Sequence, residues 1–276
     1  MIRYDLHAHS TFSDGLLTPS ALVERAAARG VDVLALTDHD ETEGIKDAGD
    51  AARAAGITLV PGAELSVSWE SHTVHVLGLM VDAANTVFSA GLASIRSGRD
   101  SRAVKMGESL ARAGIPDAYE GARRFVTSDR LISRSHFARF LVEAGHARET
   151  RDVFKRYLTQ GKPGFVTHAW AALPDAVAWI HAAGGLAIIA HPGRYRVTAT
   201  GMRRLLSEFR DAGGDGIEVH SSSHTAAQFT EYATYARAFG LLGSIGSDYH
   251  GPGESYVDLG GLPPLPAGVD PVWTRW

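Results

Sequence analysis

Histidine and carboxylate residues recur in short motifs whose spacing suits metal binding. In an extended segment, side chains two residues apart lie on the same side, so the imidazoles of His7 and His9 can share one ion. Asp14, on the loop that follows, is close enough to serve a neighbouring ion. Further motifs are Thr37-Asp38-His39-Asp40, Gly62-Ala63-Glu64, His191-Pro192-Gly193 and Ser247-Asp248-Tyr249-His250. One His-x-His pair is weak evidence, but this combination predicts a cluster of divalent metal ions.

Short apolar runs alternate with helical patterns along most of the chain. Repeated β-α units of this kind predict a parallel sheet with helices outside it, and the pattern alone fits both a doubly wound sheet and a closed barrel. Strands are expected at residues 2–6, 33–37, 57–60, 73–81, 186–190, 216–219 and 242–246. Helices are expected at residues 19–29, 41–55, 85–113, 174–183, 200–212 and 225–239.

Almost every candidate ligand lies just past the end of an expected strand. His7 and His9 follow the first strand, His39 follows the second and Glu64 ends the third. The later motifs with His191 and Asp248 also follow strands. In parallel α/β folds the active sites lie at the carboxyl ends of the strands. We therefore expect residues that are far apart in the sequence to converge on one rim.

The alternating pattern is interrupted once. Residues 114–168 are more charged, contain little strand signal and end in the loop Gly161-Lys162-Pro163-Gly164. We interpret them as a small helical insertion that contributes to the substrate pocket. The expected organisation is a first part of the barrel at 1–113, the insertion at 114–168, and a second part with a C-terminal tail at 169–276.

Composition narrows the class of protein. The 276 residues are 45% hydrophobic, which is enough for one large α/β domain. The net charge of −4 gives no global basic field for nucleic acid or membrane, and the absence of cysteine excludes disulfides and thiolate metal sites. No apolar run reaches the roughly 18 residues of a membrane span, and no signal peptide is visible. We expect a cytoplasmic protein with no membrane partner.

At these motifs, from Asp5 to His250, the chain resembles the PHP (polymerase and histidinol phosphatase) superfamily of metal-dependent phosphoesterases. It is most similar to the stand-alone branch that acts on nucleotides, notably nucleoside 3′,5′-bisphosphate phosphatases. The resemblance implies a distorted (β/α)7 barrel and a three-metal centre. It implies a first ion held by His7, His9, Glu64 and Asp248, a second held by Glu64, His75 and His191, and a third held by Asp14, His39 and His250.

The donor set indicates the kind of ion and of substrate. Mixed nitrogen and oxygen ligands suit manganese, iron or zinc better than magnesium or calcium, and the resemblance favours three Mn²⁺ ions. Six neutral imidazoles, three carboxylates and three divalent ions would give the centre a charge of about +3, which suits a phosphate dianion. Because ligating imidazoles usually donate their other nitrogen to a partner, we expect Asp38 and Asp40 to orient the ligands.

Candidate substrate and catalytic residues extend the site. Glu64, Asp248 and Arg194 are expected to act in catalysis, with Arg194 neutralising phosphate charge beside the ions. Substrate contacts are expected from Arg134, Ser135, His136, Arg194, Lys162 and His224. The remaining histidines outside the motifs are expected to be surface or packing residues, and the arginines of 96–112 a solvated helix face.

The expected reaction is removal of the 3′-phosphate from a nucleoside 3′,5′-bisphosphate to give the 5′-monophosphate (AMP), with trimming of short oligonucleotides from the 5′ end as a further activity. No obligatory protein partner is expected. Rival interpretations are a histidinol phosphatase, an amidohydrolase-like enzyme that cleaves a non-phosphate bond, and a non-catalytic metal-binding module.

Overall fold

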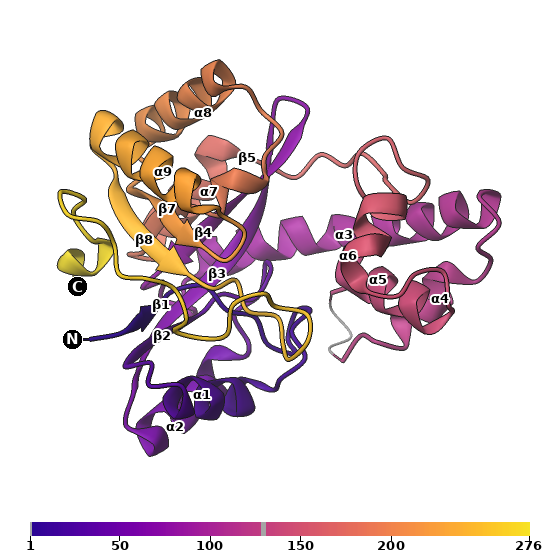
Figure 1. The fold of residues 1–276 in the computed structure, drawn as a ribbon, viewed down its shortest axis with the longest axis horizontal. Helices are drawn as coiled ribbons and strands as arrows, with labels where there is room; N and C mark the ends of the chain where they lie inside the picture. The colour runs from indigo at the N-terminus through magenta and orange to yellow at the C-terminus, as the bar shows by residue number, and fades with distance from the viewer. Residues whose placement is uncertain (1, 128–130) are drawn as a thin grey trace.

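The computed structural model describes residues 2–127 and 131–276. Its central sheet has the strand order β1-β2-β3-β4-β6-β7-β8, with β5 beside β3 (Figure 1). The strands are β1 Tyr4–Asp5, β2 Val33–Leu36, β3 Thr58–Trp69, β4 His72–Leu79, β5 Ala171–Ala172, β6 Leu186–Ile189, β7 Gly216–Ser221 and β8 Leu242–Gly246.

The sheet curls until its two ends meet. The amide of Leu6, just after β1, donates to the carbonyl of Ile245 in β8 at 2.9 Å. Further along, the amide of Asp248 donates to the carbonyl of His7 at 2.8 Å. The expected α/β fold, a distorted (β/α)7 barrel, is therefore confirmed as a nearly closed barrel, and an open doubly wound sheet is excluded.

One strand departs from the expected parallel arrangement. β4 runs antiparallel to both β3 and β6, and a tight turn at Glu70 and Ser71 replaces the crossover helix that parallel neighbours require. Glu70 has a φ of 50° there. The second half of β3 pairs with β4 as a ribbon, so Glu64 lies in the middle of a strand and does not end one, as we had expected.

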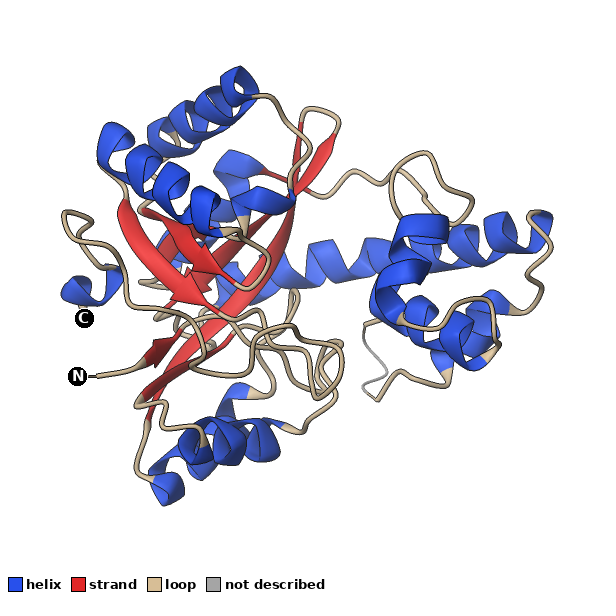
Figure 2. Ribbon diagram, in the orientation of Figure 1, coloured by secondary structure: helices blue, strands red, loops and turns tan. Residues whose placement is uncertain are grey.

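Helices cover the outside of the barrel (Figure 2). α1 (Pro19–Ala28) and α2 (Ile45–Ala55) pack against β2 on one side, and α7 (Leu173–Ala182), α8 (Ala199–Asp211) and α9 (Ala226–Phe239) enclose the other. The caps match the sequence signals: the Thr18 side chain accepts from Ala21 at 3.2 Å, and Gly56 ends α2 at φ 72°. α2 begins four residues later than expected because the Glu41 carboxylate binds the Thr42 and Glu43 amides in a turn.

The remaining helices lie beside the barrel (Figure 1). α3 (Thr86–Arg112) is 27 residues long. It leads into α4 (Ala118–Arg123), α5 (Arg134–Glu143), α6 (Thr150–Val153) and the π-helical turn Phe154–Leu158. Phe88 and Leu92 of α3 belong to the barrel core, whereas Met106 and Leu110 belong to a separate apolar core within the insertion. The division at residue 113 stays a prediction. Within the described residues, no helix is long and apolar enough to cross a membrane.

Candidate metal centre and substrate pocket

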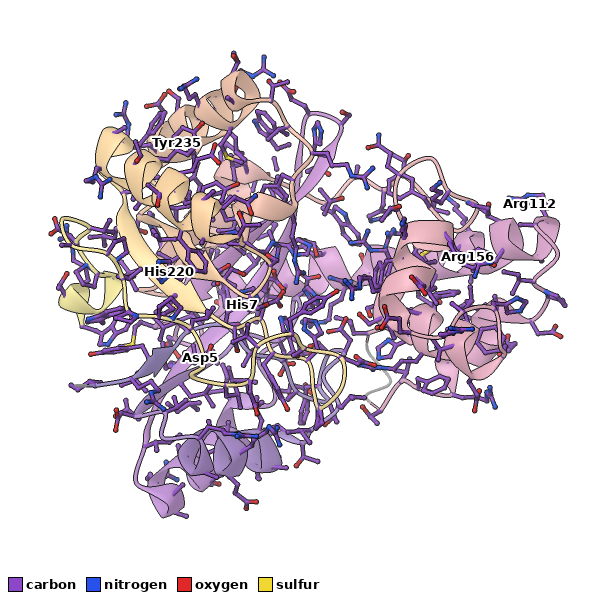
Figure 3. The ribbon with its side chains drawn as sticks, in the orientation of Figure 1. Asp5, His7, Arg112, Arg156, His220 and Tyr235 are labelled. Carbon is purple, nitrogen blue, oxygen red and sulfur yellow. The ribbon has the colours of Figure 1, made fainter. Side chains whose placement is uncertain are left out.

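The nine expected metal ligands lie at one end of the barrel. Their donor atoms form four overlapping groups, each with all atoms within 4.8 Å of one another. His7 lies near the middle of the molecule, whereas Arg112 at the end of α3 and Arg156 in the π-helical turn lie away from it (Figure 3). The groups are His7, His9 and Asp248; His7, Glu64 and His191; His39, Glu64 and His75; and His9, Asp14, His39 and His250.

The donors expected for the first ion lie close together. The Nε2 atoms of His7 and His9 are 3.1 Å apart and lie 3.4 and 3.2 Å from Asp248 Oδ1. Glu64 Oε2 is 3.5 and 3.4 Å from the same two nitrogens. Donors that share one first-row ion lie about 3 Å apart. His7, His9 and Asp248 therefore fit a shared ion, and Glu64 reaches both imidazoles.

Glu64 lies between the donor groups. Its Oε1 is 2.7 Å from His75 Nδ1 and 2.8 Å from His191 Nε2, and its Oε2 is 2.8 Å from His39 Nδ1. His39 also faces the last group, with its Nε2 3.8 Å from Asp14 Oδ1. This carboxylate can therefore bridge two ions, as the family resemblance implies.

The carboxylates carry charge although they are buried. Burial favours the neutral acid, but the nearby His75, His39 and His7 outweigh it and hold the pKa of Glu64 well below its usual value. The pKa of Asp14 is likewise lowered against burial, chiefly by His39 and His250. Asp14 Oδ1, Glu64 Oε2 and Asp248 Oδ1 accept no aligned hydrogen bond from the described residues. Buried charge of this kind requires paired cations or metal, so the donor set fits divalent ions.

The backbone around the donors is held in uncommon conformations. Asp40, His191 and Asp248 have φ values of 49°, 25° and 53°. Residues other than glycine rarely adopt positive φ, and such residues concentrate at functional sites because the surrounding structure must hold them there. The turns that follow β2, β6 and β8 therefore place their side chains at some conformational cost.

Glu218 is part of the centre and was not expected from the sequence. It lies in β7, fully buried, with Oε1 2.9 Å from His7 Nδ1 and Oε2 accepting from the backbone amide of His191. One carboxylate thus orients two ligand segments. The available signal was an acidic residue within the otherwise apolar run of residues 216–219.

Asp38 and Asp40 accept hydrogen bonds from the segments around the expected ligands. Asp38 accepts from the Ser10 amide at 2.7 Å and from Ser13 Oγ at 2.5 Å, and Ser13 Oγ lies 3.4 Å from His9 Nδ1. Asp40 accepts from the Ser66 amide at 2.7 Å. These carboxylates fasten the loops after β1 and β2 to the barrel.

The expectation that the arginines of 96–112 form a solvated face is wrong for two of them. Arg99 is 5% exposed and Arg102 is 8% exposed. Arg99 Nε donates to Asp40 Oδ2 at 2.7 Å, and both guanidinium groups lie over the Trp170 ring, at 5.0 and 5.3 Å from its centre. The barrel and the segment around Trp170 cover this face of α3, which a helical pattern cannot show.

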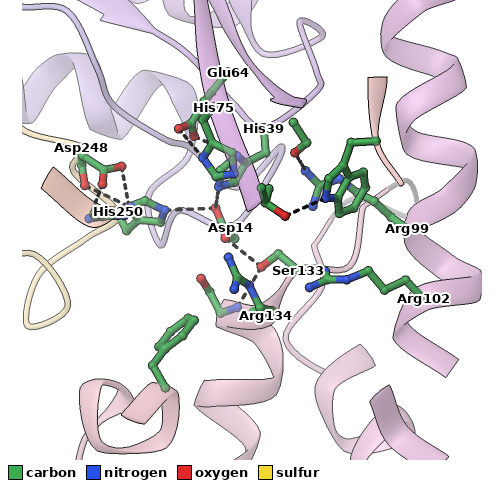
Figure 4. Close-up of a pocket in the computed structure, with 16 residues that line it drawn as sticks. Asp14, His39, Glu64, His75, Arg99, Arg102, Ser133, Arg134, Asp248 and His250 are labelled. Atoms are coloured by element: carbon green, nitrogen blue, oxygen red, sulfur yellow. Dashed lines mark hydrogen bonds and ion pairs between the residues drawn. The ribbon is translucent and has the colours of Figure 1, made fainter. Parts of the chain in front are cut away.

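A pocket opens between the metal donors and the insertion (Figure 4). Donors form one wall, and guanidinium groups approach from α3, α5 and the turn Pro192–Arg194. Arg194 is ion-paired with Asp248, and Arg134 begins α5 next to Ser135. The lining arginines are Arg99, Arg102, Arg134 and Arg194. Four positive groups beside a metal centre give a pocket suited to an anion with more than one phosphate.

Three of the expected substrate contacts line this pocket, and three do not. Arg134, Ser135 and Arg194 line it. His136 is buried in the first turn of α5, where its Nδ1 accepts from the Ser133 amide at 3.0 Å. His224 is also buried, and its Nε2 accepts from the Gly193 amide at 3.1 Å. Lys162 is exposed on a turn outside the lining. In this structure His136 and His224 hold loops in place.

Comparison with known proteins agrees with this geometry. The PHP domain matches residues 5–167. The 3′,5′-nucleoside bisphosphate phosphatase of Chromobacterium violaceum is 50% identical over 273 residues, 99% of this chain and 96% of that protein. The 5′-3′ exoribonuclease of Haemophilus influenzae is 46% identical over 274 residues, 99% of each chain.

A solved structure has nearly the same fold. It is described as an amidohydrolase from Chromobacterium violaceum with bound sulfate and no metal. It is 50% identical, with a TM-score of 0.96 over 99% of this chain and 95% of that one. The expected enzyme class, a metal-dependent phosphoesterase, is confirmed by the family match and the curated relatives. The chain belongs to the PHP domain family.

Proposed function

We propose that this protein removes the 3′-phosphate from nucleoside 3′,5′-bisphosphates to give 5′-monophosphates such as AMP, and that it trims short oligonucleotides from the 5′ end. One observation carries the proposal: a single pocket has metal donors on one wall and arginines opposite. A substrate with two phosphates can place one on each wall. The names of the relatives from Chromobacterium violaceum and Haemophilus influenzae support both activities.

The nine donors hold three divalent ions in this proposal, with manganese as the native metal. As the family resemblance implies, His7, His9, Glu64 and Asp248 would hold the first, Glu64, His75 and His191 the second, and Asp14, His39 and His250 the third. When bound, such ions supply activated water near neutral pH and neutralise the charge of the phosphate. The protein works in the cytoplasm and needs no protein partner.

The chain's own residues bind and orient the substrate. Arg194 takes a non-bridging oxygen of the reacting phosphate, because its guanidinium lies against Asp248 at the metal wall. Arg99, Arg102 and Arg134, with Ser135, take the 5′-phosphate. Burial favours the acid form of Asp248, but Arg194, His7 and His250 hold its pKa well below its usual value. Asp248 is therefore a charged carboxylate that pairs with Arg194 and would hold metal.

The test is hydrolysis of a substrate panel by the manganese-loaded protein. The panel contains adenosine 3′,5′-bisphosphate, AMP, histidinol phosphate and a short 5′-phosphorylated oligonucleotide, with released phosphate and nucleotide measured separately. The bisphosphate is expected to give phosphate and AMP with the highest kcat/KM. Glu64→Ala should lose metal and lower the rate by more than about 10³-fold, whereas exposed Glu120→Ala should match the wild type.

Other outcomes identify the rivals. Preference for histidinol phosphate, or metal binding without release of phosphate from any member of the panel, would overturn the proposed substrate. Full metal content and full activity in Glu64→Ala would overturn the metal centre itself.

A further inference from the structure

A second hollow, which we call the side groove, adjoins the substrate pocket. It lies between the β3–β4 turn, the loop after β6 and the segment after the π-helical turn. The two hollows share Thr73, His75, Arg134 and Arg194. His191 also lines the side groove, so the groove adjoins the metal donors, and its remaining lining residues are not shared with the arginine pocket.

The side groove has the chemistry of a nucleotide site. Arg196 joins Arg134 and Arg194 in its lining, and no carboxylate is among the described residues that line it. Gln160 adds an amide, and Phe165 adds an aromatic ring that is partly exposed. Positive charge attracts the phosphate backbone of nucleic acid, and aromatic rings stack on unpaired bases.

The proposed reaction gives this groove a position relative to the substrate. A nucleotide whose 5′-phosphate lies among Arg99, Arg102 and Arg134 has its 3′-phosphate at the metal wall. In an oligonucleotide this phosphate is a diester and carries the next nucleotide. That nucleotide cannot occupy the arginine pocket, which is filled by the first one. The side groove is the hollow that starts at the same donors.

We propose that the side groove binds the second nucleotide of a 5′-phosphorylated single-stranded oligonucleotide, with Arg196 and Gln160 at its phosphate and sugar and Phe165 at its base. The proposal rests on the function proposed above. Water adds its oxygen to phosphorus, the bond from phosphorus to the first nucleotide's 3′-oxygen breaks, and that oxygen leaves as a hydroxyl. The products are a 5′-monophosphate and a shorter chain that again carries a 5′-phosphate.

The experiment compares two substrates in groove variants. Arg196→Ala is expected to lower kcat/KM for a 5′-phosphorylated trinucleotide about tenfold, with the value for adenosine 3′,5′-bisphosphate within about twofold of wild type. The dependence of log kcat/KM on log salt should become shallower by about 0.7, as expected for one lost phosphate contact with a single strand. Gln160→Ala should show the same selectivity with a smaller effect. Arg210→Ala, an exposed arginine of α8, is the matched control.

Equal loss on both substrates, or no loss on the trinucleotide, would overturn the side groove and leave the bisphosphatase proposal standing. If the wild type hydrolyses neither substrate, the proposed function fails. The side groove is then tested by a binding measurement. The probe is then a trinucleotide in which a CH₂ group replaces the first 3′-oxygen. Weaker binding of this probe to Arg196→Ala, with unchanged binding of the bisphosphate, would support the groove, and unchanged binding of both would overturn it.

Discussion

At the scale of single residues, Glu218 connects two parts of the metal centre. Its carboxylate reaches the imidazole of His7 on one side and the backbone of His191 on the other. A carboxylate behind a ligating histidine fixes the orientation of the ring and the nitrogen that carries the proton, which leaves the other nitrogen free for metal. Glu218 therefore acts through the ligands, as a positioning residue.

Replacing Glu218 tests this role. Glu218→Gln keeps the size of the side chain but removes its charge, so Mn²⁺ affinity is expected to fall about 10–100-fold. Titration of the protein with Mn²⁺, followed by calorimetry, measures the affinity independently of turnover. Glu208→Gln is the matched control, because Glu208 lies in α8, belongs to none of the donor groups and accepts a hydrogen bond from Trp69. Unchanged Mn²⁺ affinity in Glu218→Gln would show that the carboxylate does not orient the ligands.

The motifs identified the centre because each occupies a few consecutive residues. His7, His9 and His39 follow strand ends, and strand ends meet by topology, so local patterns predicted a distant convergence. Glu218, Arg99 and Arg102 escaped prediction for a different reason. Each is a single charged residue in a regular element, and only the tertiary contacts show that its charge is buried against a partner.

At the scale of elements, the N-terminus of α5 reaches into the barrel. Ser133 Oγ accepts from the Ser135 amide at 3.0 Å as the helix cap and donates to Asp14 Oδ2 at 2.7 Å. The other oxygen, Asp14 Oδ1, faces the imidazoles of His39 and His250. Arg139, one helical turn further along, donates to the Asp14 carbonyl at 2.5 Å and to Glu254 Oε2 at 2.7 Å. The insertion therefore fixes the conformation of one expected ligand of the third ion.

Removal of this cap should affect metal content and stability together. Ser133→Ala is expected to lower the free energy of unfolding by about 1 kcal/mol, since an N-cap is lost. The number of Mn²⁺ ions retained after gel filtration should fall by one, because the orientation of Asp14 is released. Urea unfolding and elemental analysis measure the two effects.

Ser133→Thr serves as the control, since threonine can both cap the helix and donate to Asp14. If Ser133→Thr also loses the third ion, or if Ser133→Ala keeps all its Mn²⁺, the helix cap does not control the metal site.

The direction of β4 shows the limit of prediction at this scale. The apolar pattern of residues 73–81 correctly predicts a strand, but an apolar pattern is the same in either direction. Two residues can join only antiparallel strands, but the expected third strand stopped at residue 60, so the pattern did not show that Glu70 and Ser71 form such a turn.

At the scale of the whole molecule, the expected metal ligands join the beginning of the chain to its end. His7 and His9 follow β1, Asp248 and His250 follow β8, and backbone hydrogen bonds at 2.8 and 2.9 Å join these two segments. Ions bound here would stabilise the closure of the barrel, since metal that binds only the folded state adds its binding free energy to stability.

Chelation should therefore lower the melting temperature. An ion at 100 times its Kd contributes about 2.7 kcal/mol, which corresponds to roughly 5–10 °C for a chain of this size. Differential scanning fluorimetry with and without EDTA measures the shift, and excess Mn²⁺ should reverse it. A melting temperature that is the same with and without EDTA would contradict a metal-stabilised barrel.

The long helix α3 has a consequence for how such a protein can be modified. Its first half is part of the barrel core and its second half is part of the insertion core. A genetic deletion of residues 114–168 would leave the apolar face around Met106 and Leu110 in water. The 27-residue helix α3 contributes to both cores. Experiments that exchange the insertion between relatives should therefore join the two sequences inside this helix, near its middle.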